Sequence, residues 1–141
     1  MSHAKARNTF SEVLSGAASL KGTTINWENA RASEKNVYPR LEPYLMPAGT
    51  NSVTLDNDLE EVVGVYQVTV VTELGKGTAT SDDLVSKIYE LFPCNTEYKD
   101  DKGFTLRVSS PVTVAKGSSI GETWKVSCWF NYTALQVTKT S

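Results

Sequence analysis

The sequence predicts an α+β fold in which two amphipathic helices pack on a mostly antiparallel sheet of about five strands. Apolar residues recur with the period of a helix within residues 6–17 and 80–92, and they alternate with the period of a strand within residues 59–73. The expected order along the chain is helix, strand, strand, strand, helix, strand, strand. The 141 residues contain no internal repeat and no linker, so one domain over residues 1–141 is expected.

The first helix and the first strand are predicted from the N-terminal part of the chain. The helix presents one apolar stripe, which consists of Ala6, Phe10, Val13, Leu14 and Ala17. TTINWEN at residues 23–29 then alternates Ile25 and Trp27 with polar neighbours, and this pattern predicts a short strand.

The run VYPRLEPYLMPAGT, residues 37–50, places prolines at a strict four-residue interval, at Pro39, Pro43 and Pro47. Proline fixes φ and lacks an amide donor, so this run is expected neither in a helix nor in the middle of a sheet. We expect it to lie extended along a sheet edge or over a surface.

The strongest strand signal is LEEVVGVYQVTVVTE at residues 59–73. Its alternate positions form two apolar sets, Val62, Tyr66, Val68 and Val70 on one face and Val63, Val65 and Val71 on the other. A strand that is apolar on both faces is expected near the middle of a sheet.

The second helix follows the loop ELGKGTATS at residues 73–81. Thr80 and Asp83 resemble a capping box at the start of this helix, and Pro93 is expected to end it. Its apolar stripe consists of Leu84, Ile88, Leu91 and Phe92.

Two further strands are expected near the C-terminus. GFTLRVSSPVTV at residues 103–114 points Phe104, Leu106 and Val108 inward, and Pro111 implies an edge or a bend. In ETWKVSCWFNYTALQV, residues 122–137, one face carries Trp124, Val126, Cys128, Phe130 and Tyr132. Because Leu135 and Val137 have the opposite parity, a bulge near Thr133 or Ala134 is expected to restore the register.

The chain offers few residues for catalysis or metal binding. His3 is the only histidine, which excludes a histidine-based triad and a multi-histidine zinc site. Cys94 and Cys128 lack the spacing of a redox or metal motif and are expected to be free thiols. We therefore expect no catalytic, cofactor-binding or metal-binding residue.

Charge and hydropathy restrict the classes of protein further. The net charge of −2 argues against a general nucleic-acid binder, which needs clustered lysine and arginine. No apolar run approaches the length of a membrane helix, and the N-terminal MSHAKARN has no signal-peptide hydrophobic region, so a cytoplasmic protein is expected.

The loop from Gly75 to Thr80 leaves two interpretations open. Glycine loops before a helix N-terminus bind phosphate in some folds, but the spacing here fits neither the Walker loop nor the dinucleotide fingerprint. Asp82 and Asp83 in the first helical turn would also repel a phosphate. The other interpretation is a plain flexible loop.

Two observations indicate more apolar surface than two short helices can cover. The strand at residues 59–73 is apolar on both faces, and Trp129 falls on the face opposite Trp124. Trp129 is expected either to lie under a helix or to take part in an interface. Surplus apolar surface on a small domain usually indicates a partner.

The order of these segments resembles that of the tail terminator, or tail completion, proteins of long-tailed bacteriophages, in the small α+β group of the lambda-type terminator. The resemblance is carried by the opening helix and by four segments: INW at residues 25–27, YPRLEP at 38–43, GVYQVTV at 64–70 and GKGTATSDDLVSKIYELF at 75–92. None of them is a catalytic signature.

The resemblance implies a structural virion protein that forms a ring, expected to be a hexamer. Such a ring docks on the tail tube protein, stops polymerisation of the tube and presents its other face to the head-tail connector protein. It sits at the head-proximal end of the tail, is assembled in the bacterial cytoplasm, and lets DNA pass through its lumen without specific binding. The resemblance implies no enzymatic activity and no cofactor.

Two groups of residues are expected to form contacts in such a ring. The prolines are expected to stiffen a projecting arm that grips a neighbouring subunit or the tube, although a crossover that only covers the core is an equal alternative. The residues of the first group are Tyr38, Arg40, Leu41, Tyr44, Leu45, Met46 and, on the last strand, Trp129. The second contact loop contains Glu73, Lys76 and Thr78.

Three alternatives remain beside the tail terminator. A head-tail joining protein or another ring of the neck or tube shares the same small architecture, and fold likeness does not separate them. A small nucleotide-binding enzyme would use the Gly75–Thr80 loop for phosphate. A monomeric ligand-binding module would require a concave apolar pocket.

Overall fold

The computed structural model describes residues 2–20, 23–28, 38–52 and 59–137. The elements follow in this order: α1 (Ser2–Ser15), the 3-10 helix η1 (Ala18–Leu20), β1 (Thr24–Ile25), β2 (Arg40–Ser52), β3 (Leu59–Glu73), α2 (Ala79–Leu91), β4 (Glu97–Lys99), β5 (Phe104–Val108), β6 (Thr113–Val114), β7 (Ser118–Ile120) and β8 (Thr123–Val137). Val37 and Asn29 of the predicted extended segments lie outside the described residues.

All strands of the described chain join one sheet of eight strands, in the order β1-β2-β3-β8-β5-β4, with β6 and β7 also paired to β8. The β1–β2 pair is parallel and every other pair is antiparallel, so the sheet is mixed. The α+β class is confirmed, but the prediction of about five strands was too low. The additional strands have only two or three residues, which is too short for an alternating pattern to be recognised.

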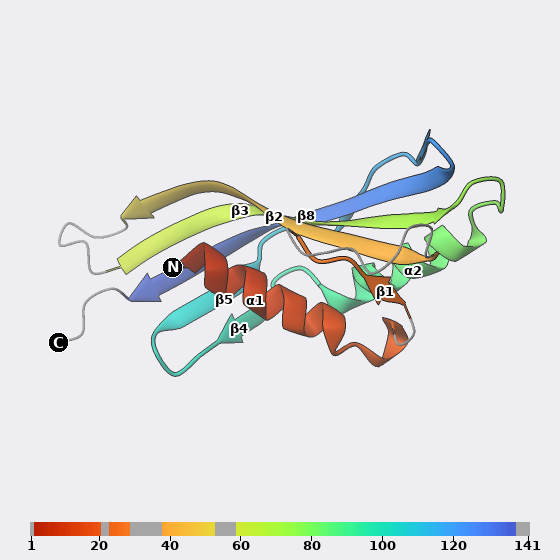
Figure 1. Cartoon of the computed structure of the whole chain (residues 1–141). Coiled ribbons are helices and arrows are strands. Elements are labelled where there is room, and N and C mark those ends of the chain that lie inside the picture. The colour runs from red at the N-terminus through yellow and green to blue at the C-terminus, as the bar shows by residue number, and fades with distance from the viewer. Residues whose placement is uncertain (1, 21–22, 29–37, 53–58, 138–141) are drawn as a thin grey trace.

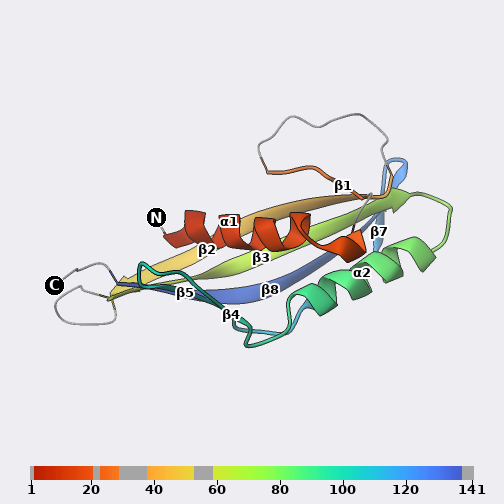
Figure 2. The ribbon, with the colours of Figure 1, turned by 90° about the horizontal axis from the view of Figure 1, so that it is seen from below.

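Both helices lie on the same side of the sheet, as Figure 1 and Figure 2 show. α1 packs on β2, β3 and β8, and α2 packs on β3. The chain termini lie at one end of the long strands, and the β3–α2 loop and the β7–β8 hairpin lie at the other end (Figure 1). No helix of the described residues lies on the opposite side of the sheet, which is called the helix-free face below.

The core lies between the helices and the sheet and centres on Phe10 of α1, which is fully buried. Its ring contacts five aromatic rings of the sheet and α2, with centroid distances of 5.0 Å to Tyr66, 5.0 Å to Phe130, 5.8 Å to Phe92, 5.8 Å to Tyr132 and 6.1 Å to Tyr98. The predicted inward sets of both helices and of β3, β5 and β8 supply most of this core. Phe10 therefore joins α1 to three strands and to α2.

The four-residue interval of the prolines follows from the direction of the peptide groups in β2. The Leu41 carbonyl accepts a hydrogen bond from the Asn26 amide at 2.8 Å, and the Leu45 amide donates to Glu28 Oε1 at 3.0 Å, so these peptide groups point away from β3. The peptide groups of every second residue in a strand point to the same side. The backbone nitrogens of Pro43 and Pro47 therefore also point away from β3. Neither proline removes a bond to β3. Beyond Arg40 and Leu41, which pair with β1, β2 is the edge of the described sheet, so the prediction of a sheet edge is confirmed for Pro43 and Pro47.

The same segment is not a projecting arm. Arg40 to Pro47 pairs residue by residue with β3, and the register shifts only between Pro47 and Gly49. The hypothesis of an arm was therefore wrong for the part of the run that the structure describes. The outward prolines are compatible with an edge strand, and the two long strands bury apolar side chains on the helix side.

Two local predictions were also wrong. α2 begins at Ala79 and not after Thr80, because the Asp82 amide already donates to the Thr78 carbonyl at 2.8 Å. β8 pairs with β3 without a break from Thr123 to Val137, so it contains no bulge. Leu135 and Val137 consequently lie on the helix-free face.

Among the described residues, neither helix has the length and apolar character needed to cross a bilayer.

The buried hydroxyls of Tyr66 and Tyr132 should make the folded chain less stable at alkaline pH. Burial raises the pKa of each hydroxyl from 10.0 to about 12. Between these values the unfolded chain has released protons that the folded chain retains, so stability present below pH 10 is lost as pH rises toward 12.

Tyr66→Phe should therefore leave the melting temperature almost unchanged at pH 7 and flatten its decline above pH 10. The variant keeps the aromatic ring and loses only a long contact of 3.4 Å between the Tyr66 hydroxyl and Ser11. Thermal melts of both proteins between pH 7 and 11.5 test this. An equally steep alkaline decline in the variant would show that Tyr66 does not contribute.

Candidate interaction surface

One end of the helix-free face is covered by charged side chains of the chain itself. Arg40 Nε lies 3.0 Å from Glu42 Oε2, and Lys125 Nζ lies 3.8 Å from Glu42 Oε1. Arg40 and Lys125 flank Val71 on the two neighbouring strands, and Val71 is fully buried. This end of the face therefore needs no partner to exclude water from its apolar residue.

The middle of the helix-free face remains partly open. The register brings Tyr44 and Met46 of β2, Val63 and Val65 of β3, and Trp129 of β8 onto neighbouring positions. We call these five residues the open patch. They are partly exposed, Met46 to 38%, and no helix of the described chain lies over them.

The open patch is held in place by the sheet. Gln67 lies between Tyr44 and Trp129 in the register, and its Nε2 donates a hydrogen bond to the Tyr44 hydroxyl at 2.5 Å. The two aromatic residues come from strands that are joined only through β3. A patch on three paired strands is rigid enough to present a defined surface to a partner.

The structure divides the first group of predicted contact residues. Tyr44, Met46 and Trp129 meet in the open patch, and Arg40 lies at its charged border. Leu41 and Leu45 were wrongly assigned to a contact surface, because they are 0% and 4% exposed and belong to the core. Neighbouring residues of a strand point to opposite faces, so β2 cannot present all five of its predicted contact residues to one partner.

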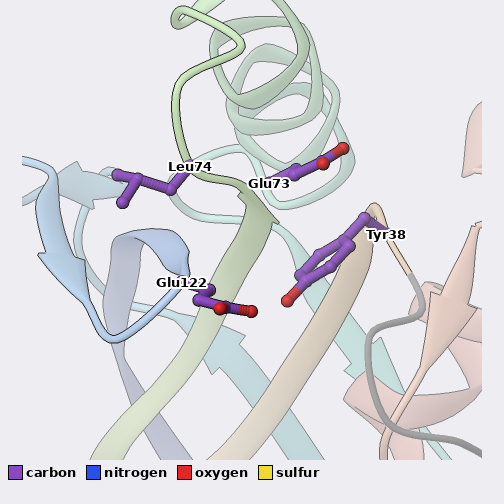
Figure 3. A pocket seen from close by; sticks show the side chains of 4 residues that line it. All are labelled: Tyr38, Glu73, Leu74 and Glu122. Atoms are coloured by element: carbon purple, nitrogen blue, oxygen red, sulfur yellow. The ribbon is translucent and has the colours of Figure 1, made fainter.

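The second predicted loop meets the start of the proline run at the end of the molecule. Tyr38, Glu73, Leu74 and Glu122 line a cavity of about 490 Å³, and Figure 3 shows the Tyr38 hydroxyl and the Glu122 carboxylate pointing toward each other. Lys76 lines a smaller neighbouring cavity. The sequence identified both segments, but it gave no sign that they are adjacent in space.

The geometry of this end is unfavourable for phosphate. Two carboxylates, those of Glu73 and Glu122, line the larger cavity, and both residues are exposed. Gly75 and Gly77 have φ values of 86° and 77°, and a Cβ on either one would meet no atom of the described residues within 4 Å. The loop is therefore open to solvent and does not form a closed cradle around an anion. The described residues also contain no group of three or more potential metal ligands.

Sequence reasoning did not assign Val63 and Val65 to a contact surface. Their placement on the second face of β3 was correct, and the apolar character of both faces of residues 59–73 was the available signal. What was missing was the position of both helices on the other face, which depends on contacts that are distant in sequence.

Comparisons with known proteins match nearly the whole chain. A family model described as phage tail terminator protein matches residues 6–132, a range that includes the open patch and the β3–α2 loop. Ten chains among the solved structures match; one of them is 25% identical, with a TM-score of 0.78 and coverage of 99% of each chain. None of the curated proteins matches.

Proposed function

The chain belongs to the phage tail terminator family, and from this premise we propose that it caps the tail tube of a long-tailed phage as a ring and stops tube polymerisation. Family membership makes the protein a structural component of the phage tail in the virion. The proposal adds a hexameric ring, docking on the tail tube protein, and a second face for the head-tail connector.

The open patch is the observation that best supports the proposed ring. Five partly exposed residues, mostly apolar, lie side by side on a face that no described helix covers, while one end of that face is covered by its own charged side chains. Apolar residues at the centre with charges at the border are the usual composition of a protein interface. A partner protein is thus a better match to this surface than a small molecule.

The charge of the chain agrees with a ring through which DNA passes. A net charge of −2 provides no excess of cations to hold phosphates. DNA in the lumen would then move without being retained. The lumen is part of the proposal, because a ring of subunits encloses a central opening.

The test uses purified tail tube protein that polymerises on its own. Added to growing tubes, the protein should limit their length and appear as a cap at one end in electron micrographs, and light scattering should give the mass of the ring. Tubes of unchanged length that carry no cap would contradict the proposal. Binding to the connector without any effect on tubes would favour a head-tail joining protein.

Met46→Asp should abolish the ring and leave the monomer folded. The Met46 side chain is 38% exposed, so a carboxylate there is solvated in the monomer, but it would be desolvated at the centre of an interface. Ala4→Asp, on the exposed side of α1, is the matched control and should leave the ring intact. Light scattering gives the mass, and thermal melts check folding. A ring of normal mass formed by Met46→Asp would show that the open patch is not part of the subunit interface.

The nucleotide-binding enzyme makes a different prediction. A nucleotide that binds only the folded chain must raise its melting temperature. The carboxylates of Glu73 and Glu122 oppose such binding, so we expect no shift with millimolar nucleotide.

A further inference from the structure

The edges of the sheet are poorly suited to joining two copies of the chain. On β2, Pro43 and Pro47 have no amide to donate, and the outward amide of Leu45 already donates to Glu28. On the other side of the sheet, β4 has three residues and exposes the charged side chains of Glu97 and Lys99. Short, charged or proline-containing edges resist strand pairing. Copies are therefore expected to meet through their faces.

A ring requires two different contact surfaces on each subunit, since a head-to-tail contact joins one patch to another. If the proposed ring is correct, the open patch needs a counterpart elsewhere on the chain. The two surfaces must also lie on roughly opposite sides of the subunit. The counterpart is thus expected on the helix side of the sheet.

The C-terminal end of α2 provides a surface of this kind. A cavity of about 380 Å³ opens between α2 and the segment after β5, and Tyr89, Phe92, Pro111 and Val112 form much of its lining. Tyr89 is 55% exposed at its border. Figure 2 shows α2 on the side of the sheet away from the helix-free face.

The charges around the two surfaces are complementary. The exposed side of α2 carries the carboxylates of Asp82 and Glu90, and neither forms an ion pair with a described residue. Next to the open patch, exposed Arg107 of β5 lies in register with Thr133, which pairs with Val63. Arg107 likewise has no ion pair within the described chain. Of these two carboxylates, that of Glu90 lines the α2 cavity, and a cation beside one apolar surface with a carboxylate beside the other favours one orientation of contact.

We propose that the open patch of one subunit packs on the α2 cavity of the next subunit, with Arg107 facing Glu90. This inference rests on the proposed ring and specifies its subunit contact. The occupant of the open patch is then a second copy of the same chain. The tube and the connector would bind the ends of the subunit and not this face.

Cys94 provides a reporter for this contact. It is exposed and lines the α2 cavity, whereas Cys128 is 1% exposed in the core and its thiol donates to the Val68 carbonyl at 3.3 Å. Only Cys94 should therefore react with a maleimide in the folded chain. Labelling is measured by mass spectrometry on the monomer and on rings, in free solution or on tube ends. We expect complete labelling of Cys94 in the monomer and almost none in rings, while a control thiol in Ala4→Cys stays reactive in both.

A charge exchange tests the orientation. Arg107→Glu and Glu90→Arg should each reduce ring formation, because each places like charges opposite one another, and the double variant should restore it. Both positions are exposed, and thermal melts confirm that each monomer is folded. Rings in which Cys94 remains fully reactive, or a double variant that forms no ring, would overturn the proposed contact.

The outcomes separate this contact from the proposed function. Rings with reactive Cys94 overturn the contact and leave the ring function standing. Tubes limited in length by a protein that never forms a ring overturn the contact and the ring, but not the capping activity. A chain that forms no ring and does not affect tubes overturns both proposals.

Discussion

Phe10→Ala should lower the free energy of unfolding by about 3–5 kcal/mol, the range found when a buried phenylalanine is truncated. Phe10 is fully buried, and its ring contacts five aromatic residues of β3, β4, β8 and the end of α2. The surrounding rings are held by paired strands and cannot collapse into the space that the substitution leaves. The loss therefore includes both the burial of the ring and the cavity that remains.

Equilibrium unfolding in urea measures this loss. Glu12→Ala, on the exposed side of the same helix, is the matched control and should change stability by less than about 0.5 kcal/mol. A loss below about 1 kcal/mol for Phe10→Ala would mean that α1 contributes little to the core.

Gly64→Ala should destabilise the protein by about 1–3 kcal/mol, which is the usual penalty for overfilling a packed site. A Cβ at Gly64 would lie 2.5 Å from the Tyr132 hydroxyl oxygen and 2.7 Å from the Met46 carbonyl oxygen. The carbonyl belongs to a paired strand and cannot move freely. Because β3 lies between β2 and β8, any adjustment would have to pass through the sheet.

Gly49→Ala separates this steric effect from the general effect of replacing glycine. Among the described residues, the atom nearest to its Cβ would be Val63 Cγ2 at 3.9 Å, and the backbone there does not have a positive φ. The loss of freedom in the unfolded chain should make this variant neutral or slightly more stable. Equal midpoints for both variants in urea unfolding would contradict the predicted contact of Tyr132 with Gly64.

The elements that local periodicity determines were predicted well. The range of β3, residues 59–73, agrees with the structure at both ends, α2 ends just before Pro93, and Phe104, Leu106 and Val108 point inward as expected. These features depend on the alternation or helical repeat of neighbouring residues, which the sequence contains directly. The resemblance to tail terminators, also read from the order of segments, is confirmed by the family match.

Features that depend on distant pairing were not predicted. β4 and β7 are strands only because β5 and β8 offer them partners, and β6, expected as part of one strand over residues 103–114, is separate from β5 and pairs with β8 on its own. The expected bulge in β8 assumed that Leu135 must reach the core, whereas the sheet leaves it on the helix-free face. The open patch combines residues that lie as far apart in the sequence as Tyr44 and Trp129. It is uncovered because both helices pack on the other face of the sheet. A single sequence contains no direct indication of which face of the sheet the helices cover.

The outward prolines of β2 have a further consequence for a protein proposed to stop the growth of another polymer. Head-to-tail pairing through strand edges has no natural limit, because each added copy still exposes its other edge for the next copy. Contacts between faces can close after a fixed number of copies, and growth then ends. Pro43 and Pro47 thus favour finite assembly over fibre formation, and a proposed length regulator would itself be unable to elongate without limit.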